Sequence, residues 1–138
     1  MVEEVIIHSS RGDYELRLFN PHLLGSQRHV DYFSVTLKGY DITVSLPIVS
    51  TLQSFDLTYD LPWFFEDIAA NWKGWKGEKI WASIEEDFSL QATSDSTGHI
   101  CLEITMKSDC NWRFQGEIWI DAGATEDIAK KISKFLHL

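Results

Sequence analysis

Cysteine and proline are scarce in this chain, which has two cysteines and three prolines among 138 residues. Two cysteines are too few for a disulfide scaffold. If His99–Lys107 and Trp112–Asp121 form a hairpin, Cys110 lies in its turn and Cys101 lies several residue pairs away, beyond disulfide reach. Both cysteines are therefore expected to be free thiols, as in a reduced, cytoplasmic protein.

Long apolar runs are missing as well. None approaches the length needed to cross a membrane. The acidic start, Met1–Glu4, lacks the basic and apolar regions of a signal peptide. We therefore expect one cytoplasmic domain over residues 1–138, without a membrane partner.

Motifs for catalysis and metal binding are also lacking. The five histidines and two cysteines have no zinc-site spacing, and Gly74 and Gly77 do not form a phosphate-binding loop. The acidic run Glu85–Asp87 is more typical of a solvated turn than of a general acid–base pair. These absences favour a binding protein that is not an enzyme and has no metal or cofactor. An enzyme whose site is assembled from dispersed residues is the less favoured alternative.

Basic residues are outnumbered, with 12 lysines and arginines against 21 aspartates and glutamates, for a formal net charge of −9. This sign of charge opposes binding to phosphates, so DNA, RNA and anionic membranes are not expected partners. A basic protein would be attracted instead. Solubility alone would also explain an acidic chain.

What the chain does have is a series of alternating segments. Apolar and polar residues alternate through most of the first 50 residues and again from residue 80 to residue 121, with short turns between the segments. Pro47 indicates an edge strand, because proline cannot donate to a sheet ladder. The predicted fold class is α+β, a largely antiparallel sheet of about eight strands with one central and one C-terminal helix.

Two segments have helical spacing. The first begins at Asp60-Leu61-Pro62, a capping acid followed by a first-turn proline, and is expected to end at Lys73-Gly74. The second has acids at its start and lysines at its end, which suits the helix dipole. Its apolar stripe is Ile128, Ala129, Ile132, Phe135 and Leu136.

Side-chain alternation also predicts which face of the sheet is buried. Ile100, Leu102, Ile104, Phe114 and Ile118 should face the core, and Glu103, Gln115 and Glu117 should face away. The same pattern places Ile80, Ala82 and Ile84 opposite Trp81. Trp81 and Trp119 are therefore expected on the outer face, unless a helix covers that face and makes both tryptophans part of the core.

Three tryptophans lie within ten residues in the segment Trp72-Lys73-Gly74-Trp75-Lys76-Gly77-Glu78-Lys79-Ile80-Trp81. Trp72 and Trp75 are expected to seal the core, with lysine stems across their rings. An exposed anchor for a partner is the alternative.

This segment also carries a family resemblance. Together with Asp31-Tyr32-Phe33, Phe64-Phe65, Gly98-His99-Ile100, Trp112–Gly116 and Asp121-Ala122-Gly123, it resembles an uncharacterised family of small bacterial proteins, from about Asp31 to the end of the chain. In size, charge and lack of catalytic residues, the chain is also similar to immunity proteins of polymorphic and contact-dependent growth-inhibition toxin systems. That similarity implies no particular residues.

The functional hypothesis is a cytoplasmic immunity protein that neutralises a bacterial toxin domain, for example a basic nuclease. A structural or regulatory protein-binding module is the alternative. Binding hot spots combine aromatic or arginine anchors with a polar surround. The predicted partner-binding residues are Trp81, Trp119, Glu85, Glu103, Arg113 and Glu117, with Asp56, Asp60, Glu66 and Asp67 as a second group.

Overall fold

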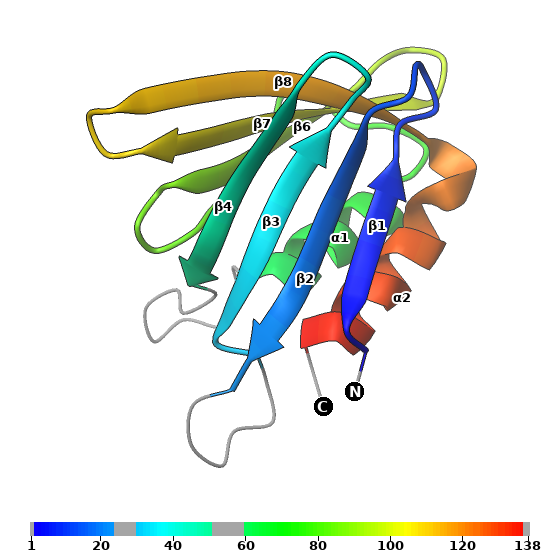
Figure 1. Cartoon of the computed structure of the whole chain (residues 1–138). Coiled ribbons are helices and arrows are strands. Elements are labelled where there is room, and N and C mark those ends of the chain that lie inside the picture. Colours follow the sequence, from blue (N-terminus) through cyan, green and yellow to red (C-terminus); the bar gives the residue numbers. More distant parts are fainter. Residues whose placement is uncertain (1, 24–29, 51–59, 137–138) are drawn as a thin grey trace.

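The computed structural model describes residues 2–23, 30–50 and 60–136 (Figure 1). Within these residues it contains eight strands, two α-helices and a single 3₁₀ turn. In chain order they are β1 (Glu4–His8), β2 (Glu15–His22), β3 (Tyr32–Lys38), β4 (Thr43–Ser50), α1 (Leu61–Ala70), β5 (Lys79–Ala82), β6 (Phe88–Ser94), β7 (His99–Ser108), β8 (Trp112–Asp121), the 3₁₀ turn (Ala122–Ala124) and α2 (Thr125–Leu136). The predicted α+β class is confirmed.

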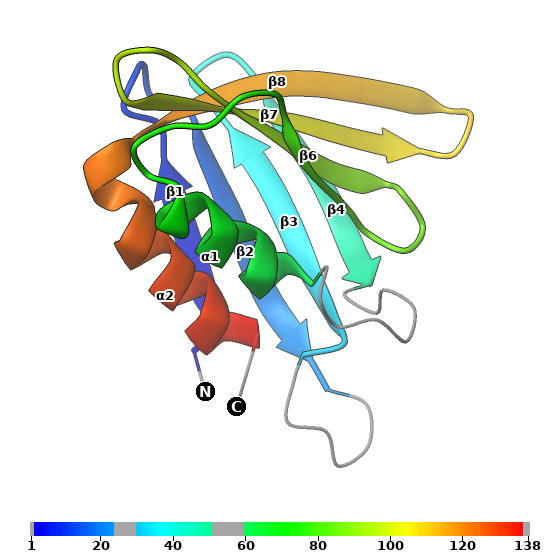
Figure 2. The same cartoon turned by 180° about the vertical axis from the view of Figure 1, so that it is seen from behind.

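The strands form two antiparallel sheets of four strands each, in the orders β1-β2-β3-β4 and β5-β6-β7-β8. The strands of the second sheet run across the upper ends of the first (Figure 1). Seen from behind, α1 and α2 lie side by side against the first sheet and below the second (Figure 2). The core therefore lies between the two sheets and the helix pair.

Three phenylalanine rings join these layers. The ring centroid of Phe33 on β3 lies 6.2 Å from that of Phe88 on β6 and 6.1 Å from that of Phe135 on α2. Both pairs of rings meet edge to face. All three side chains are fully buried. Edge-to-face aromatic pairs contribute beyond their buried area, so these contacts fix both sheets and α2 around one centre.

Alternation along β7 and β8 follows the prediction. Ile100, Leu102, Ile104 and Ile118 are buried, and Phe114 is partly buried against the core. The intervening residues, Glu103, Gln115 and Glu117 among them, are partly or fully exposed. The inward and outward faces of this hairpin could thus be assigned from sequence.

The assignment along β5 was wrong. Trp81 is only 3 % exposed, whereas Ile80, predicted to face the core, is 59 % exposed. Trp81 pairs with Leu90 on β6, and the centroid of its ring lies 5.6 Å from that of Phe88. Directly paired residues share a face, and β6 turns Phe88 and Leu90 inward. The larger tryptophan therefore takes the core position.

Alternation in the sequence predicts one apolar face for β4, formed by Ile42, Val44, Leu46 and Ile48. In the structure the buried face changes partway along the strand. Val35 pairs with Leu46 but Phe33 pairs with Val49, so β4 contains one extra residue, a β-bulge near Pro47. Ile48 is consequently 63 % exposed, and Val49 is buried. The hydroxyl of Ser34 donates to the Pro47 carbonyl at 2.6 Å. As predicted, the strand with Pro47 is a sheet edge.

Both predicted helices are present. Asp60 caps α1 by accepting a hydrogen bond from the Trp63 backbone N–H at 2.9 Å. The helix ends at Ala70, three residues before the predicted Lys73. On α2, the predicted stripe is buried or partly buried.

The expectation for the tryptophans that follow α1 was half right. Trp75 packs against the core with the Lys79 Nζ 5.0 Å from its ring. Trp72 lies beyond the helix end and is 50 % exposed, with the Lys73 Nζ 5.5 Å from its ring. Because α1 stops at Ala70, Trp72 no longer follows the buried stripe of the helix.

Candidate functional site

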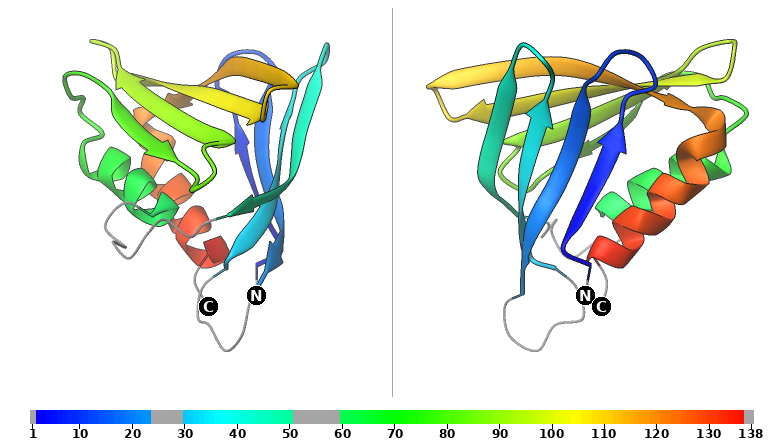
Figure 3. Two further views of the ribbon diagram at one scale, coloured as in Figure 1. Left: turned by 90° about the vertical axis from the view of Figure 1, so that its left-hand side faces the viewer. Right: turned by 45° about the vertical axis from the view of Figure 1, so that its right-hand side comes forward.

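The outer face of the second sheet is the side turned away from the core. Figure 3 shows the helices and the first sheet on the opposite side. The residues that alternate onto the outer face are Ile80 and Ala82 of β5, Ser89, Gln91 and Thr93 of β6, Cys101, Glu103, Thr105 and Lys107 of β7, and Arg113, Gln115, Glu117 and Trp119 of β8. Polar side chains dominate this set.

Two glutamates face each other on the outer face, about halfway along β7 and the edge strand β8. Glu103 on β7 and Glu117 on β8 are direct cross-strand partners. Gln115 Nε2 donates to Glu103 Oε1 at 2.6 Å, and the Cys101 thiol donates to Glu117 Oε2 at 2.9 Å. Among the described residues, neither carboxylate has a basic side chain within ion-pair distance. Like charges that face each other across a strand pair are destabilising, and no ion pair with a described residue offsets the repulsion between these two carboxylates.

Cys101 is a protonated thiol that donates to one carboxylate of the glutamate pair. Burial, and next the hydrogen bond to Glu117, raise the pKa of Cys101 to about 12. Because the thiolate is the reactive form of cysteine, this side chain is a poor nucleophile near neutral pH. It acts here as a hydrogen-bond donor to a carboxylate.

Trp119 lies two residue pairs further along the sheet, on the same face and opposite Cys101. The guanidinium of Arg11 stacks over its ring, with Cζ 3.9 Å from the ring centroid. Ser9 and Ser10, in the same connection between β1 and β2, bond the Trp119 backbone. Ser9 Oγ accepts from its N–H at 2.9 Å and Ser10 N–H donates to its carbonyl at 2.8 Å. A loop of the first sheet thus anchors the edge of the second.

The predicted residues on the second sheet are only partly brought together. Glu103, Glu117, Trp119 and Arg113 share the outer face, and Arg113 is paired with Lys107. Glu85 is exposed in the turn between β5 and β6. Trp81 was wrongly placed on this face, since it is buried in the core against Phe88.

The described members of the second predicted group have different surroundings. Asp60 is engaged as the helix cap, and Asp67 accepts from Lys79 Nζ at 2.7 Å. Glu66 is exposed on α1. Asp56 lies outside the described residues.

The sequence pattern did not single out Arg11, which lies in the turn between β1 and β2. Nothing local to that turn indicates a contact with Trp119, because the contact joins two different sheets. Gln115 was predicted to face outward, but its bond to Glu103 depends on side-chain conformation.

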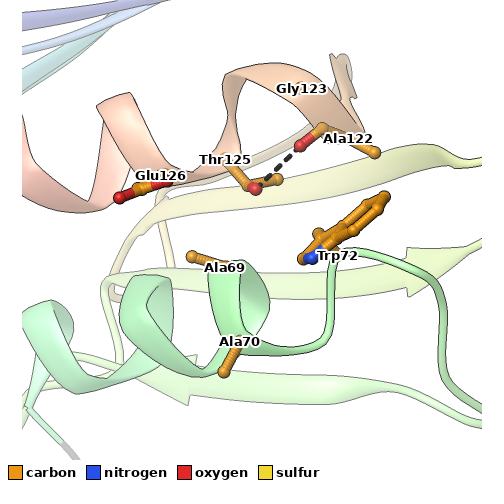
Figure 4. Close-up of a pocket in the computed structure, with 7 residues that line it drawn as sticks. All are labelled: Ala69, Ala70, Trp72, Ala122, Gly123, Thr125 and Glu126. Atoms are coloured by element: carbon orange, nitrogen blue, oxygen red, sulfur yellow. Dashed lines mark hydrogen bonds between the residues drawn. The ribbon is translucent and has the colours of Figure 1, made fainter.

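A shallow groove between the two helix ends was also missed (Figure 4). It has a volume of about 580 Å³. Its lining residues are Ala69, Ala70, Trp72, Ala122, Gly123, Thr125 and Glu126. The Thr125 hydroxyl donates to the Ala122 carbonyl at 2.8 Å. The lining therefore combines small side chains and the Trp72 ring with the Glu126 carboxylate.

Metal-binding clusters and membrane-spanning helices are both missing from the described part of the chain. No group of three or more histidine, cysteine, aspartate or glutamate residues there could hold a metal ion. No helix in those residues is both long enough and apolar enough to cross a membrane.

Comparison with known proteins identifies a family. The chain belongs to a family of unknown function (DUF6228), whose model matches residues 7–138. This match supports the expectation of an uncharacterised family, and it begins nearer the N-terminus than the resemblance from about Asp31. No curated protein and no solved structure matches the chain.

Proposed function

We propose that this member of a family of unknown function binds a basic protein through the outer face of the second sheet. The observation that carries the proposal is the Glu103–Glu117 pair, two facing carboxylates without a described cation between them. A lysine or arginine from a partner would remove the repulsion and form charge-assisted hydrogen bonds, which are stronger than neutral ones.

The surroundings of the pair support a protein partner. Trp119 supplies an aromatic surface beside the carboxylates, and Ile80 supplies an exposed apolar side chain on the same face. An aromatic anchor with charged neighbours is a typical composition for binding hot spots. The net charge of −9 disfavours nucleic acid and favours a basic protein.

More specifically, we propose that the partner is a bacterial toxin domain and that the chain is its cytoplasmic immunity protein. A nuclease binds phosphates with basic side chains. The paired carboxylates would occupy that basic surface in place of the anionic substrate. Neutralisation then requires tight binding and no catalysis by this chain.

The experiment is co-expression with the products of the neighbouring genes, among which the proposal expects a toxin domain. We expect the chain to co-purify with the toxin and to restore growth. The variant E103Q/E117Q should weaken binding roughly tenfold or more, since hydrogen bonds to charged groups contribute about 1.5–3 kcal/mol. The matched control is E126Q/D127N on α2, which removes the same charge from exposed positions off the outer face.

The two parts of the proposal can fail separately. Equal losses in E103Q/E117Q and E126Q/D127N would show that net charge, and not the outer face, determines binding. A chain that neither binds nor protects against such a toxin is no immunity protein. Loss of binding to another basic protein specifically in E103Q/E117Q would then support the regulatory module.

A further inference from the structure

The stack of Arg11 on Trp119 indicates what kind of basic side chain the outer face accepts. The guanidinium lies 3.9 Å from the ring centroid, and the loop that carries it is fixed to the Trp119 backbone through Ser9 and Ser10. The planar guanidinium stacks on aromatic rings in a way that a lysine ammonium does not. The Trp119 ring is therefore a platform for arginine.

Arg11 stacks on Trp119 but, within the described part of the chain, forms no ion pair with the nearby Glu117. Glu117 lies on the same face two residues before Trp119, about 7 Å along an extended strand. Among the described residues, Arg11 forms no ion pair with Glu117 or Glu103. A guanidinium that lies flat on a ring has its N–H groups in its own plane, parallel to the ring. These groups can still donate to a neighbouring carboxylate.

We propose that a partner arginine displaces Arg11 from Trp119 and donates to Glu117, so that Arg11 covers the binding position in the free protein. This inference rests on the proposed function and specifies its partner contact as arginine and not lysine. Arg11 acts as an internal competitor. Removing Arg11 should strengthen binding, because the apparent affinity for a ligand falls as the fraction of protein with a covered site rises.

The test uses the full chain labelled with 5-fluorotryptophan and followed by fluorine NMR. The six tryptophans give separate signals, and Trp119→Phe assigns one of them. The probes are the peptides hexa-arginine and hexa-lysine, which have equal charge. The variants are R11K, which keeps the charge and weakens the stack, R11A, and R113A, which removes one positive charge from the same face.

We expect hexa-arginine to bind more tightly than hexa-lysine and to shift the Trp119 signal. Because an exposed cation–π contact is weak, R11A should strengthen hexa-arginine binding roughly two- to five-fold beyond the effect of R113A. R11K should strengthen it without any change in net charge.

Equal binding of the two peptides, together with equal effects of R11A and R113A, would overturn the arginine proposal. The outer face could still bind cations in that case, which E103Q/E117Q would reveal by weakening both peptides. If neither peptide moves the Trp119 signal in any variant, both the arginine contact and the proposed face are wrong.

Discussion

At the scale of single residues, Gly39 is required because there is no room for a side chain, and not because of its backbone conformation. A Cβ at this position would overlap the ring of Tyr14. The Tyr14 hydroxyl donates to Asp41, and this hydrogen bond is the main cause that raises the pKa of Tyr14 to about 12. The hydroxyl therefore remains a donor at neutral pH and holds the ring over Gly39, between the β1–β2 and β3–β4 connections.

Replacing Gly39 with alanine should therefore destabilise the fold. Overpacking against a fixed ring costs about 1–3 kcal/mol, measurable as a lower urea midpoint. Gly123 is a matched control, because a Cβ there meets no atom within 4 Å. G39A and G123A variants of equal stability would contradict the account of Tyr14.

Single residues also show how far the sequence could predict the candidate site. Strict alternation in a hairpin with a short turn was sufficient to place Glu103, Glu117 and Trp119 outward. Alternation contains no information about Arg11, which reaches Trp119 from another sheet. Contacts between distant segments depend on how the sheets pack, and no local pattern records that packing.

At the scale of elements, β5 shows why alternation alone can choose the wrong face. Both of its faces carry large apolar residues, Ile80 on one and Trp81 on the other. Pairing with β6 decides between them, because Trp81 lies opposite the buried Leu90. The bulge at Pro47 in β4 was similarly unpredictable, since one extra residue exchanges the faces of all residues after it.

Substitutions in β5 test this assignment directly. Trp81→Ala should cost about 3–5 kcal/mol, as for other large aromatic residues removed from a core. Ile80→Ala should stay within about 0.5 kcal/mol of the unmodified chain, as is usual for surface positions. Urea unfolding of the two variants gives both values. A larger loss for Ile80→Ala would mean that Trp81 and Ile80 have been assigned to the wrong faces.

At the scale of the whole molecule, the strand order follows from sequence but the division into two sheets does not. Short connections within each half of the chain predict antiparallel neighbours, as observed. α1 separates the two halves and packs beside α2. The resulting layers leave the outer face of the second sheet, with its two facing glutamates, uncovered by the helices (Figure 3).

That uncovered pair implies a conflict between stability and binding. In the free protein, Glu103 and Glu117 repel each other, so E103Q should raise the free energy of unfolding by roughly 0.2–1 kcal/mol. The substitution keeps an amide oxygen to accept from Gln115, which limits other losses. Screening by salt should reduce this gain, and urea unfolding at low and high ionic strength measures it.

The same substitution should weaken binding of a basic partner, so stability and affinity move in opposite directions. E126Q on α2 is the control, since it removes an equal charge along with the ion pair to Lys130 at 3.3 Å. Loss of that exposed pair should lower stability by only a few tenths of a kcal/mol. If E103Q destabilises the chain as much as E126Q does, the glutamate pair is a satisfied part of the sheet. A partner cation would then relieve no repulsion. The main observation that supports the outer face as the binding surface would be contradicted.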